Sequence, residues 1–215
     1  MTTNRDILTL AQWLSPAFPV GAFAYSHGLE AAVRAGWVAS GADLAEWLED
    51  VIANGSGRND CILLRAAYAA EDDAALGGVD ALARAFAASR ERQLEQAQQG
   101  AAFCKTSAAI WGGDAVAYLY PVAVGAAAAK LRIDPELTAA MYLQAVASNL
   151  IAAAQRLMPL GQTEGQAVLS ALAPLCEEVA QSTASLACDD LQSTAFLSDI
   201  AAMRHEVQQP RIFRT

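Results

Sequence analysis

Residues 134–157 read DPELTAAMYLQAVASNLIAAAQRL and carry the clearest helix signal in the chain. Asp134 is a residue type that caps helix N-termini, Pro135 fits the first helical turn, and Glu136 meets the positive end of the helix dipole. The stretch that follows is rich in alanine, the strongest helix former. The segment therefore predicts one long helix from Pro135 to Leu157.

Helical periodicity extends in both directions from this segment. Near the N-terminus, Ile7, Leu10, Ala11 and Leu14 repeat at the spacing of one helix face. Ser40 and Asp43 have the spacing of a capping box that opens another helix. Further helices are predicted at 26–35, 40–54, 60–70, 80–110, 121–131, 162–186 (with a bend at Pro174) and 191–206. No stretch alternates for long like a strand and no linker is visible, so residues 1–215 predict an all-α, single-domain bundle of roughly eight to ten helices.

The composition favours some classes of protein over others. The chain has 215 residues, of which 54% are hydrophobic and 17% charged, with a net charge of −9. An acidic chain argues against nucleic acid and against an anionic membrane surface as partners. The longest apolar run, 115–129, is broken by Pro121 and Gly125 and is too short to span a bilayer. With no signal peptide at the start of the sequence, the expected location is the cytoplasm.

The four cysteines, Cys61, Cys104, Cys176 and Cys188, lie far apart and include no CxxC pair. Because structural disulfides are rare in the cytosol, these residues are expected to be free thiols in the core.

The sequence contains few of the residue motifs that an enzyme needs. No P-loop pattern occurs, and residues 24–28 (AYSHG) approach a nucleophile elbow but lack the preceding strand. The carboxylate pairs at 72–73, 177–178 and 189–190 lack the third carboxylate of a magnesium motif. His27 and His205 are the only histidines and do not have zinc-site spacing. We therefore expect no catalytic activity, no metal site and no tightly bound cofactor, with a transient or dimer-bridging metal site as the alternative.

Residues 15–30, SPAFPVGAFAYSHGLE, form an unusually apolar loop followed by a short helix. Two prolines stiffen the loop, and Phe18, Phe23 and Tyr25 are residue types that favour interface hot spots. The alternative is that these aromatic rings fold down onto the bundle.

The C-terminal tail is locally basic in an acidic protein. Residues 204–215 read RHEVQQPRIFRT, in which three arginines surround an isoleucine and a phenylalanine. Arginine forks and one aromatic side chain can dock an acidic partner surface, so residues 207–215 are predicted to be a partner-docking tail. The alternative is a frayed chain end.

These segments resemble the UreF family of urease accessory proteins. Residues 15–30 are similar to the family pattern S-P-x-[FL]-P-x-G-x-[FY]-x-[YH]-S-x-G-L-E, and residues 204–214 to R-H-E-x-Q-x-x-R-[LI]-F-R. Residues 154–162, AQRLMPLGQ, also resemble the family's helix-ending segment, so the resemblance spans about 7–214. Ala24, the pair Gln209-Pro210 and Thr215 depart from the pattern.

The resemblance implies an all-helical homodimer without chemistry of its own. Such a protein would bridge the accessory protein UreD (UreH in some bacteria) and the GTPase UreG on apo-urease, while the complex handles nickel. It further implies that the tail binds UreD/UreH and becomes ordered on contact, and that residues 25–30 line a partner or dimer surface. The implied partner-binding residues are Tyr25, Ser26, His27, Glu30, Arg204, His205, Glu206, Arg211, Phe213 and Arg214. Two alternatives stay open: a helical adaptor for an unrelated target, or a GTPase-activating partner of UreG that supplies an arginine.

Overall fold

The structure is a computed structural model that describes residues 2–215. These residues form α-helices and short 3-10 turns and contain no strand, which confirms the all-α prediction. The helices are α1 (Asn4–Trp13), α2 (Leu29–Arg34), α3 (Gly41–Asn54), α4 (Ser56–Ala69), α5 (Asp73–Ala85), α6 (Arg90–Trp111), α7 (Tyr120–Leu131), α8 (Pro135–Leu157), α9 (Gln162–Ser182) and α10 (Phe196–His205). The 3-10 turns are η1 (Ala22–Ala24), η2 (Thr183–Ser185) and η3 (Cys188–Asp190).

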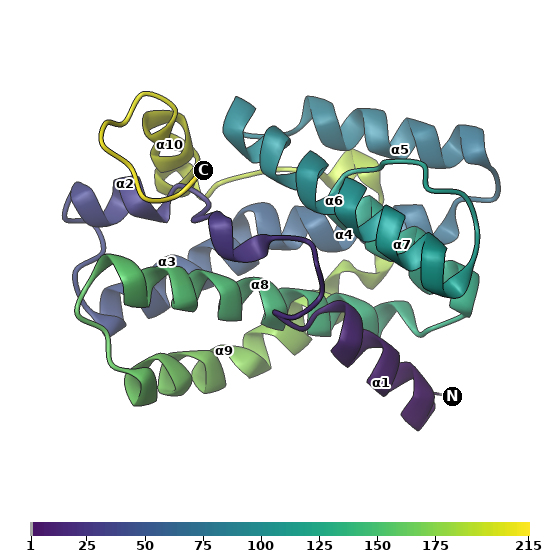
Figure 1. Ribbon diagram of the computed structural model, residues 1–215, viewed down its shortest axis with the longest axis horizontal. Coiled ribbons are helices and arrows are strands. Elements are labelled where there is room, and N and C mark those ends of the chain that lie inside the picture. The colour runs from purple at the N-terminus through teal and green to yellow at the C-terminus, as the bar shows by residue number, and fades with distance from the viewer. Residues whose placement is uncertain (1) are drawn as a thin grey trace.

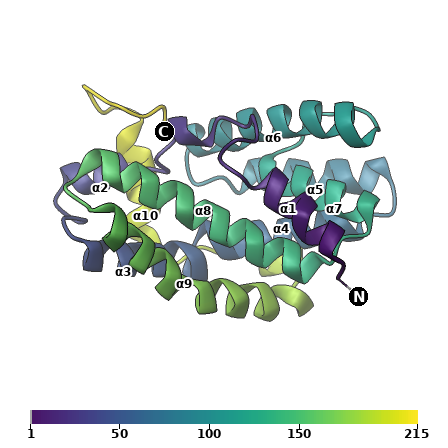
Figure 2. The same cartoon turned by 60° about the horizontal axis from the view of Figure 1, so that its bottom comes forward.

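The helices pack as one bundle around α4, which contacts α3, α5, α7, α8 and α9. Helices α8 and α9 lie side by side in Figures 1 and 2, joined by a short turn. The same two views place α2, α10 and the C-terminus together at one end of the bundle, with the N-terminus at the other. The last part of the chain therefore returns to the segment that follows the N-terminal loop.

Helix α8 has the predicted bounds, and the Asp134 side chain accepts a hydrogen bond from the Glu136 backbone N–H at 3.2 Å. By length and composition alone this helix could cross a membrane, but 50% of its most apolar window is buried inside the bundle. It packs along α9 and against α4, as the core helix of a helical bundle does.

An aromatic cluster anchors the N-terminal loop to the core. The Phe103 ring lies 5.4 Å from Trp13, 5.5 Å from Phe18 and 5.9 Å from Tyr120, measured between ring centroids. Phe18 is therefore buried, as the alternative for this loop predicted, whereas Phe23 remains 76% exposed. Val20 and Tyr25 are buried as well, so several side chains fix the loop to the bundle.

Two helix boundaries differ from the prediction where the backbone turns. The helix predicted at 26–35 begins only at Leu29, because His27 and Gly28 have φ angles of 61° and 80° in the left-handed region. The helix predicted at 80–110 is two helices, α5 and α6, and the Ser89 side chain caps the second through the Arg92 backbone N–H at 3.1 Å.

Three further boundaries shift for local reasons. Helix α4 begins at Ser56 rather than residue 60, because Gly55 alone separates it from α3. Helix α9 contains Pro174 and ends at Ser182, after which 3-10 turns and extended chain lead to α10 at Phe196 instead of residue 191. The start of α3, in contrast, is as predicted: the Ser40 side chain accepts from the Asp43 backbone N–H, and the Asp43 side chain accepts from the Ser40 backbone N–H.

The cysteines follow the prediction for three of the four positions. Cys61, Cys104 and Cys176 are free and buried, whereas Cys188 is free but only partly buried.

Candidate docking site at the C-terminal tail

Helix α10 crosses α2 at a point where only glycine fits. A Cβ atom placed on Gly28 would lie 2.5 Å from the backbone nitrogen of Ala202 and 2.8 Å from its Cα. Such separations are shorter than van der Waals contact, so the two backbones meet through the missing side chain. This close crossing brings the C-terminal end of α10 over the first turn of α2.

The carboxylate of Glu30, in that first turn, receives the tail. Glu30 is 6% exposed, and its two oxygens each accept a backbone N–H at 2.8 Å, Oε1 from Ile212 and Oε2 from Phe213. A buried carboxylate is stable only when donors replace the lost water, and the turn of the tail supplies two of them.

His205, near the end of α10, lies between two carboxylates and has no exposed surface. Its Nδ1 is 2.7 Å from Glu91 Oε2 and its Nε2 is 3.3 Å from Glu30 Oε2. The Arg211 guanidinium donates to the other oxygen of Glu91. Four charged or titratable groups therefore connect α2, α6, α10 and the tail.

The last residues of the chain are also bonded to the bundle. Ser26 donates to the carbonyl oxygen of Thr215 through its hydroxyl at 2.6 Å and its backbone N–H at 2.8 Å. The Thr215 hydroxyl donates to Glu95 at 2.6 Å. Phe213 is 3% exposed, and the Arg156 guanidinium lies 4.3 Å from its ring centroid.

The tail thus differs from the expectation that it becomes ordered on contact with a partner. It is already folded against its own chain, because Glu30, Ser26 and the pocket for the Phe213 ring satisfy its backbone and its aromatic side chain. It is not a frayed end either. The predicted aromatic anchor of the tail is occupied within the bundle.

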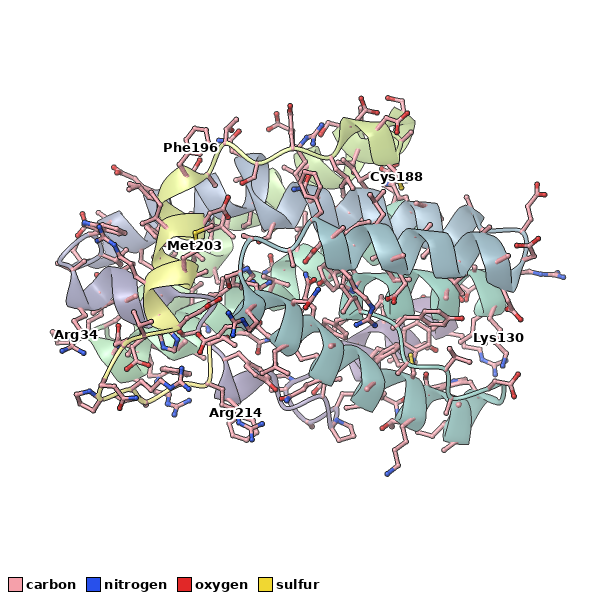
Figure 3. The ribbon with its side chains drawn as sticks, turned by 90° about the horizontal axis from the view of Figure 1, so that it is seen from above. Arg34, Lys130, Cys188, Phe196, Met203 and Arg214 are labelled. Carbon is pink, nitrogen blue, oxygen red and sulfur yellow. The ribbon has the colours of Figure 1, made fainter. Side chains whose placement is uncertain are left out.

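Other predicted residues border the tail. Gln98 Oε1 accepts from the Tyr25 hydroxyl at 2.5 Å and from the Arg214 guanidinium at 3.3 Å. Glu206 accepts from the Arg90 backbone N–H at 2.7 Å, which joins the end of α10 to the start of α6. In Figure 3 the labelled Arg214 lies beside the tail loop and points away from the bundle.

Two of the predicted residues, Arg204 and His27, have contacts other than Glu30 and Glu91. The Arg204 guanidinium lies 4.9 Å from the Trp37 ring centroid on the outside of α10. His27 faces the interior, with Nε2 3.0 Å from the Ser56 hydroxyl. Burial, followed by the positive charge of Arg92, lowers the pKa of His27 to about 3, so its imidazole is neutral near pH 7.

A buried polar group lies behind His27. Burial raises the pKa of Asp60 to about 6, against the charge of Arg92 and hydrogen bonds from the Tyr142 hydroxyl at 2.9 Å and the Gln96 amide at 3.0 Å. Among residues 2–215, no group of three or more His, Cys, Asp or Glu side chains is placed to hold a metal ion.

The sequence analysis missed the outer face of α10. Phe196, Ile200 and Met203 are 65%, 40% and 53% exposed, and Val207 beyond the helix end is 82% exposed. Figure 3 shows Phe196 and Met203 on this helix. The inner face carries the small residues Ser198, Ala201 and Ala202. The signal was the spacing of the large apolar residues at i, i+4, i+7 and i+11, which marks one helix face.

The fold is an all-α bundle, and its last helix exposes an apolar face next to a tail that is folded against the bundle. The UreF family profile matches residues 38–173. A urease accessory protein UreF from Ruegeria pomeroyi is 49% identical over 213 residues, covering 99% of this chain and 98% of that protein. Proteins of the same name from Roseobacter denitrificans (51% identical, covering 100% of this chain and 96% of that protein) and Cereibacter sphaeroides (52%, covering 99% and 100%) are similar. The chain belongs to the UreF family of urease accessory proteins, and its role lies in urease maturation.

Proposed function

We propose that this chain bridges UreD/UreH and the GTPase UreG on apo-urease and so supports nickel incorporation. In this proposal it acts as a cytoplasmic homodimer without chemistry of its own or a tightly bound cofactor, and nickel is cargo that the complex handles. The bridging role is what the UreF resemblance implies, and the surface at the C-terminal end of the chain supports it.

The observation that carries the proposal is the apolar face of α10. Large apolar side chains that share one helix face and remain exposed mark a surface for a partner. Phe196, Ile200 and Met203 form this face, and Arg204, the residue after Met203 on the same helix, is also exposed. An apolar face with an arginine at its end fits a partner surface that is apolar with an acidic group at its edge. We assign UreD/UreH to this surface.

The predicted site residues divide into two groups under this proposal. Arg204, Arg211 and Arg214 reach the solvent and are available for contact. The buried members hold the tail in position and set where those arginines stand; they are Tyr25, Ser26, Glu30, His205 and Phe213. Glu206 fastens the end of α10 to α6, and His27 faces the interior of the bundle.

The test is co-expression with UreD and UreG, followed by size-exclusion chromatography with light scattering. A double variant, Phe196→Asp with Met203→Asp, places two charges on the α10 face without touching the core. The expected result is loss of co-elution with UreD while the circular dichroism spectrum stays helical. Leu8→Asp, on α1 at the other end of the bundle and 70% exposed in the native chain, is the matched control and is expected to retain the complex. Retained binding by the double variant would contradict the proposal.

The two alternatives give different results in the same preparation. A chain that associates with neither UreD nor UreG while it remains folded would be a helical adaptor for another target. A chain that supplies an arginine to UreG would raise GTP turnover by roughly 10³–10⁵-fold, as arginine fingers do.

A further inference from the structure

A cavity lies at the end of the bundle opposite the C-terminal tail. Its volume is about 250 Å³, and it is bordered by α1, α5, α6, α7 and the loop 112–119 that joins α6 to α7. Lys130, on its border, lies at the opposite end of the bundle from Met203 and Arg34 in Figure 3. The proposed docking at α10 makes no use of this cavity.

The walls of the cavity are aromatic and small apolar side chains. Trp13 of α1 and Trp111 of α6 stand edge to face, with ring centroids 5.5 Å apart. The side formed by α7 carries three alanines, Ala123, Ala126 and Ala127. Aromatic rings pack favourably against other rings in edge-to-face and offset arrangements, and the small alanine side chains leave room for one beside the indoles. The chemistry of the walls therefore fits an aromatic ring.

The volume of the cavity indicates how large that ring system is. An apolar cavity of about 150 Å³ binds benzene. The cavity of about 250 Å³ in this chain therefore has room for two fused rings. Water would need roughly eight molecules at about 30 Å³ each to fill it, and indole and alanine walls offer them few hydrogen bonds.

The loop that borders the cavity is fixed at both ends. At its start, the Lys130 ammonium donates to the carbonyl oxygen of Gly112. At its end, the Leu119 backbone N–H donates to Asp80 Oδ1 at 2.6 Å. The frame of the opening is therefore set within the chain itself, as in the pre-formed pockets that bind small molecules.

A buried donor at the cavity lacks a partner. Trp13 is 1% exposed, and within residues 2–215 its indole Nε1 has no hydrogen-bond partner. An unpaired buried N–H group costs free energy, which a ligand acceptor would restore. Because an indole N–H only donates, the matching ligand atom is an acceptor such as a ring nitrogen or a carbonyl oxygen.

The charges at the border of the cavity favour a neutral ligand. Asp73 and Asp114 are carboxylates, and the Lys130 ammonium is bonded to the carbonyl oxygen of Gly112. An organic anion would meet two carboxylates. A cation without an acceptor would lie near the ammonium and leave the Trp13 donor unpaired. A neutral molecule with an acceptor avoids both costs.

We propose that the cavity between α1, α6 and α7 binds a small, neutral, bicyclic aromatic molecule that presents a hydrogen-bond acceptor to Trp13. Its rings lie between the indoles of Trp13 and Trp111 and the alanines of α7. This inference goes beyond the proposed function, because neither the α10 face nor the tail takes part in the site.

Titration of the nitrogen-15-labelled full-length chain with quinoline tests the proposal. Quinoline has two fused rings, is neutral at pH 7.5, and has a ring nitrogen that accepts and does not donate. The four tryptophans each give one indole N–H signal. Saturable shifts are expected for Trp13 and Trp111, with the Trp13 proton moving downfield as it gains an acceptor. Trp37 and Trp47 lie outside the cavity and are expected to stay unchanged. Equal shifts at all four signals, or no saturable shift at Trp13, would overturn the proposal.

Two charged probes of the same ring size test the ligand class. 2-Naphthoate is an anion, and N-methylquinolinium is a cation whose ring nitrogen no longer accepts. Each is expected to bind about tenfold more weakly than quinoline, the effect of roughly one lost hydrogen bond. Binding of either probe as tight as that of quinoline would overturn the assignment to a neutral ligand.

A pair of variants on α7 tests the location. Ala126→Phe places a ring where the ligand would lie, and it is expected to abolish the Trp13 shift while the circular dichroism spectrum stays helical. Ala129→Phe is the matched control, because Ala129 is also partly exposed on α7 but is not part of the cavity wall. It is expected to bind quinoline as the native chain does. Quinoline binding retained by Ala126→Phe would contradict the proposal.

The three probe titrations on the native chain decide the question even if Ala126→Phe does not fold. They need no partner protein, and the α10 double variant Phe196→Asp with Met203→Asp is expected to bind quinoline normally. Failure of UreD binding and failure of this site are therefore distinguishable.

Discussion

Replacing Gly28 by alanine tests the crossing of α2 and α10, on which the whole tail site depends. The new Cβ would lie 2.5 Å from the backbone nitrogen of Ala202, and the φ angle of +80° disfavours any side chain. Gly36 offers a matched control in the same part of the chain. Its φ angle is +74°, but a Cβ there would have no neighbour within 4 Å. Gly36→Ala therefore carries the conformational cost without the clash.

The structure gives the expected sizes of the two effects. A left-handed conformation costs an alanine about 1–2 kcal/mol, and both variants carry this cost. Forcing extra volume into a packed contact adds about 1–3 kcal/mol, and only Gly28→Ala carries this cost because its neighbours are backbone atoms. The free energy of unfolding, or of undocking α10, is therefore expected to fall by about 2–5 kcal/mol for Gly28→Ala and by about 1–2 kcal/mol for Gly36→Ala.

Urea denaturation gives the global loss for each variant, and amide exchange in α10 gives the local loss. Gly28→Ala is expected to lose protection in α10 and at Ile212 and Phe213, whereas Gly36→Ala is expected to keep it. The reasoning would be refuted if the two variants lost the same free energy and protected α10 equally, because the backbone contact with Ala202 would then carry no energetic weight.

Three other substitutions probe the buried groups. The pKa of His27 is about 3 in the folded chain and 6.5 in the unfolded chain. The contribution of the neutral imidazole to stability is therefore present above pH 6.5 and is lost as the pH falls. In urea titrations at pH 5, His27→Asn should reduce this loss of unfolding free energy by about 2 kcal/mol. The pKa of Asp60 is about 6 in the folded chain and 3.8 in the unfolded chain. The contribution of the protonated carboxyl to stability is therefore present below pH 3.8 and is lost as the pH rises through 6. Asp60→Asn should remove about 3 kcal/mol of this pH-dependent loss of stability, measured by thermal melts between pH 4 and 8. Phe213→Ala empties the pocket under Arg156 and should weaken tail docking by about 3 kcal/mol, measured as faster tryptic cleavage at Arg211; an unchanged cleavage rate would contradict the packing of this ring.

The helices could be predicted where the signal for them is local. Asp134 with Pro135 and Ser40 with Asp43 determine where α8 and α3 begin, because a cap and its hydrogen-bond partners lie within three residues of each other. The break between α5 and α6 was not predicted, since the alanine-rich sequence around residue 86 is compatible with an unbroken helix. The local signal that was missed is Ser89, whose side chain caps α6 through the Arg92 backbone N–H.

The candidate site could be predicted as a set of residues but not as an arrangement. The resemblance to the UreF family pointed to Glu30, His205 and Phe213, and the structure brings all three together. Their burial could not be inferred, because the donors to Glu30 come from the opposite end of the chain. Sequence position alone made the tail appear to be a free segment, whereas its backbone N–H groups are already bonded.

Helix α10 places small residues against the bundle and large apolar residues toward water, the reverse of an ordinary surface helix. This inversion makes the behaviour of the chain in solution depend on concentration. At high concentration the exposed faces of two copies can bury one another, so overproduction alone favours self-association, although the net charge of −9 opposes it. The ratio in which the chain and any protein that covers α10 are synthesised would then set how much of the chain stays dispersed.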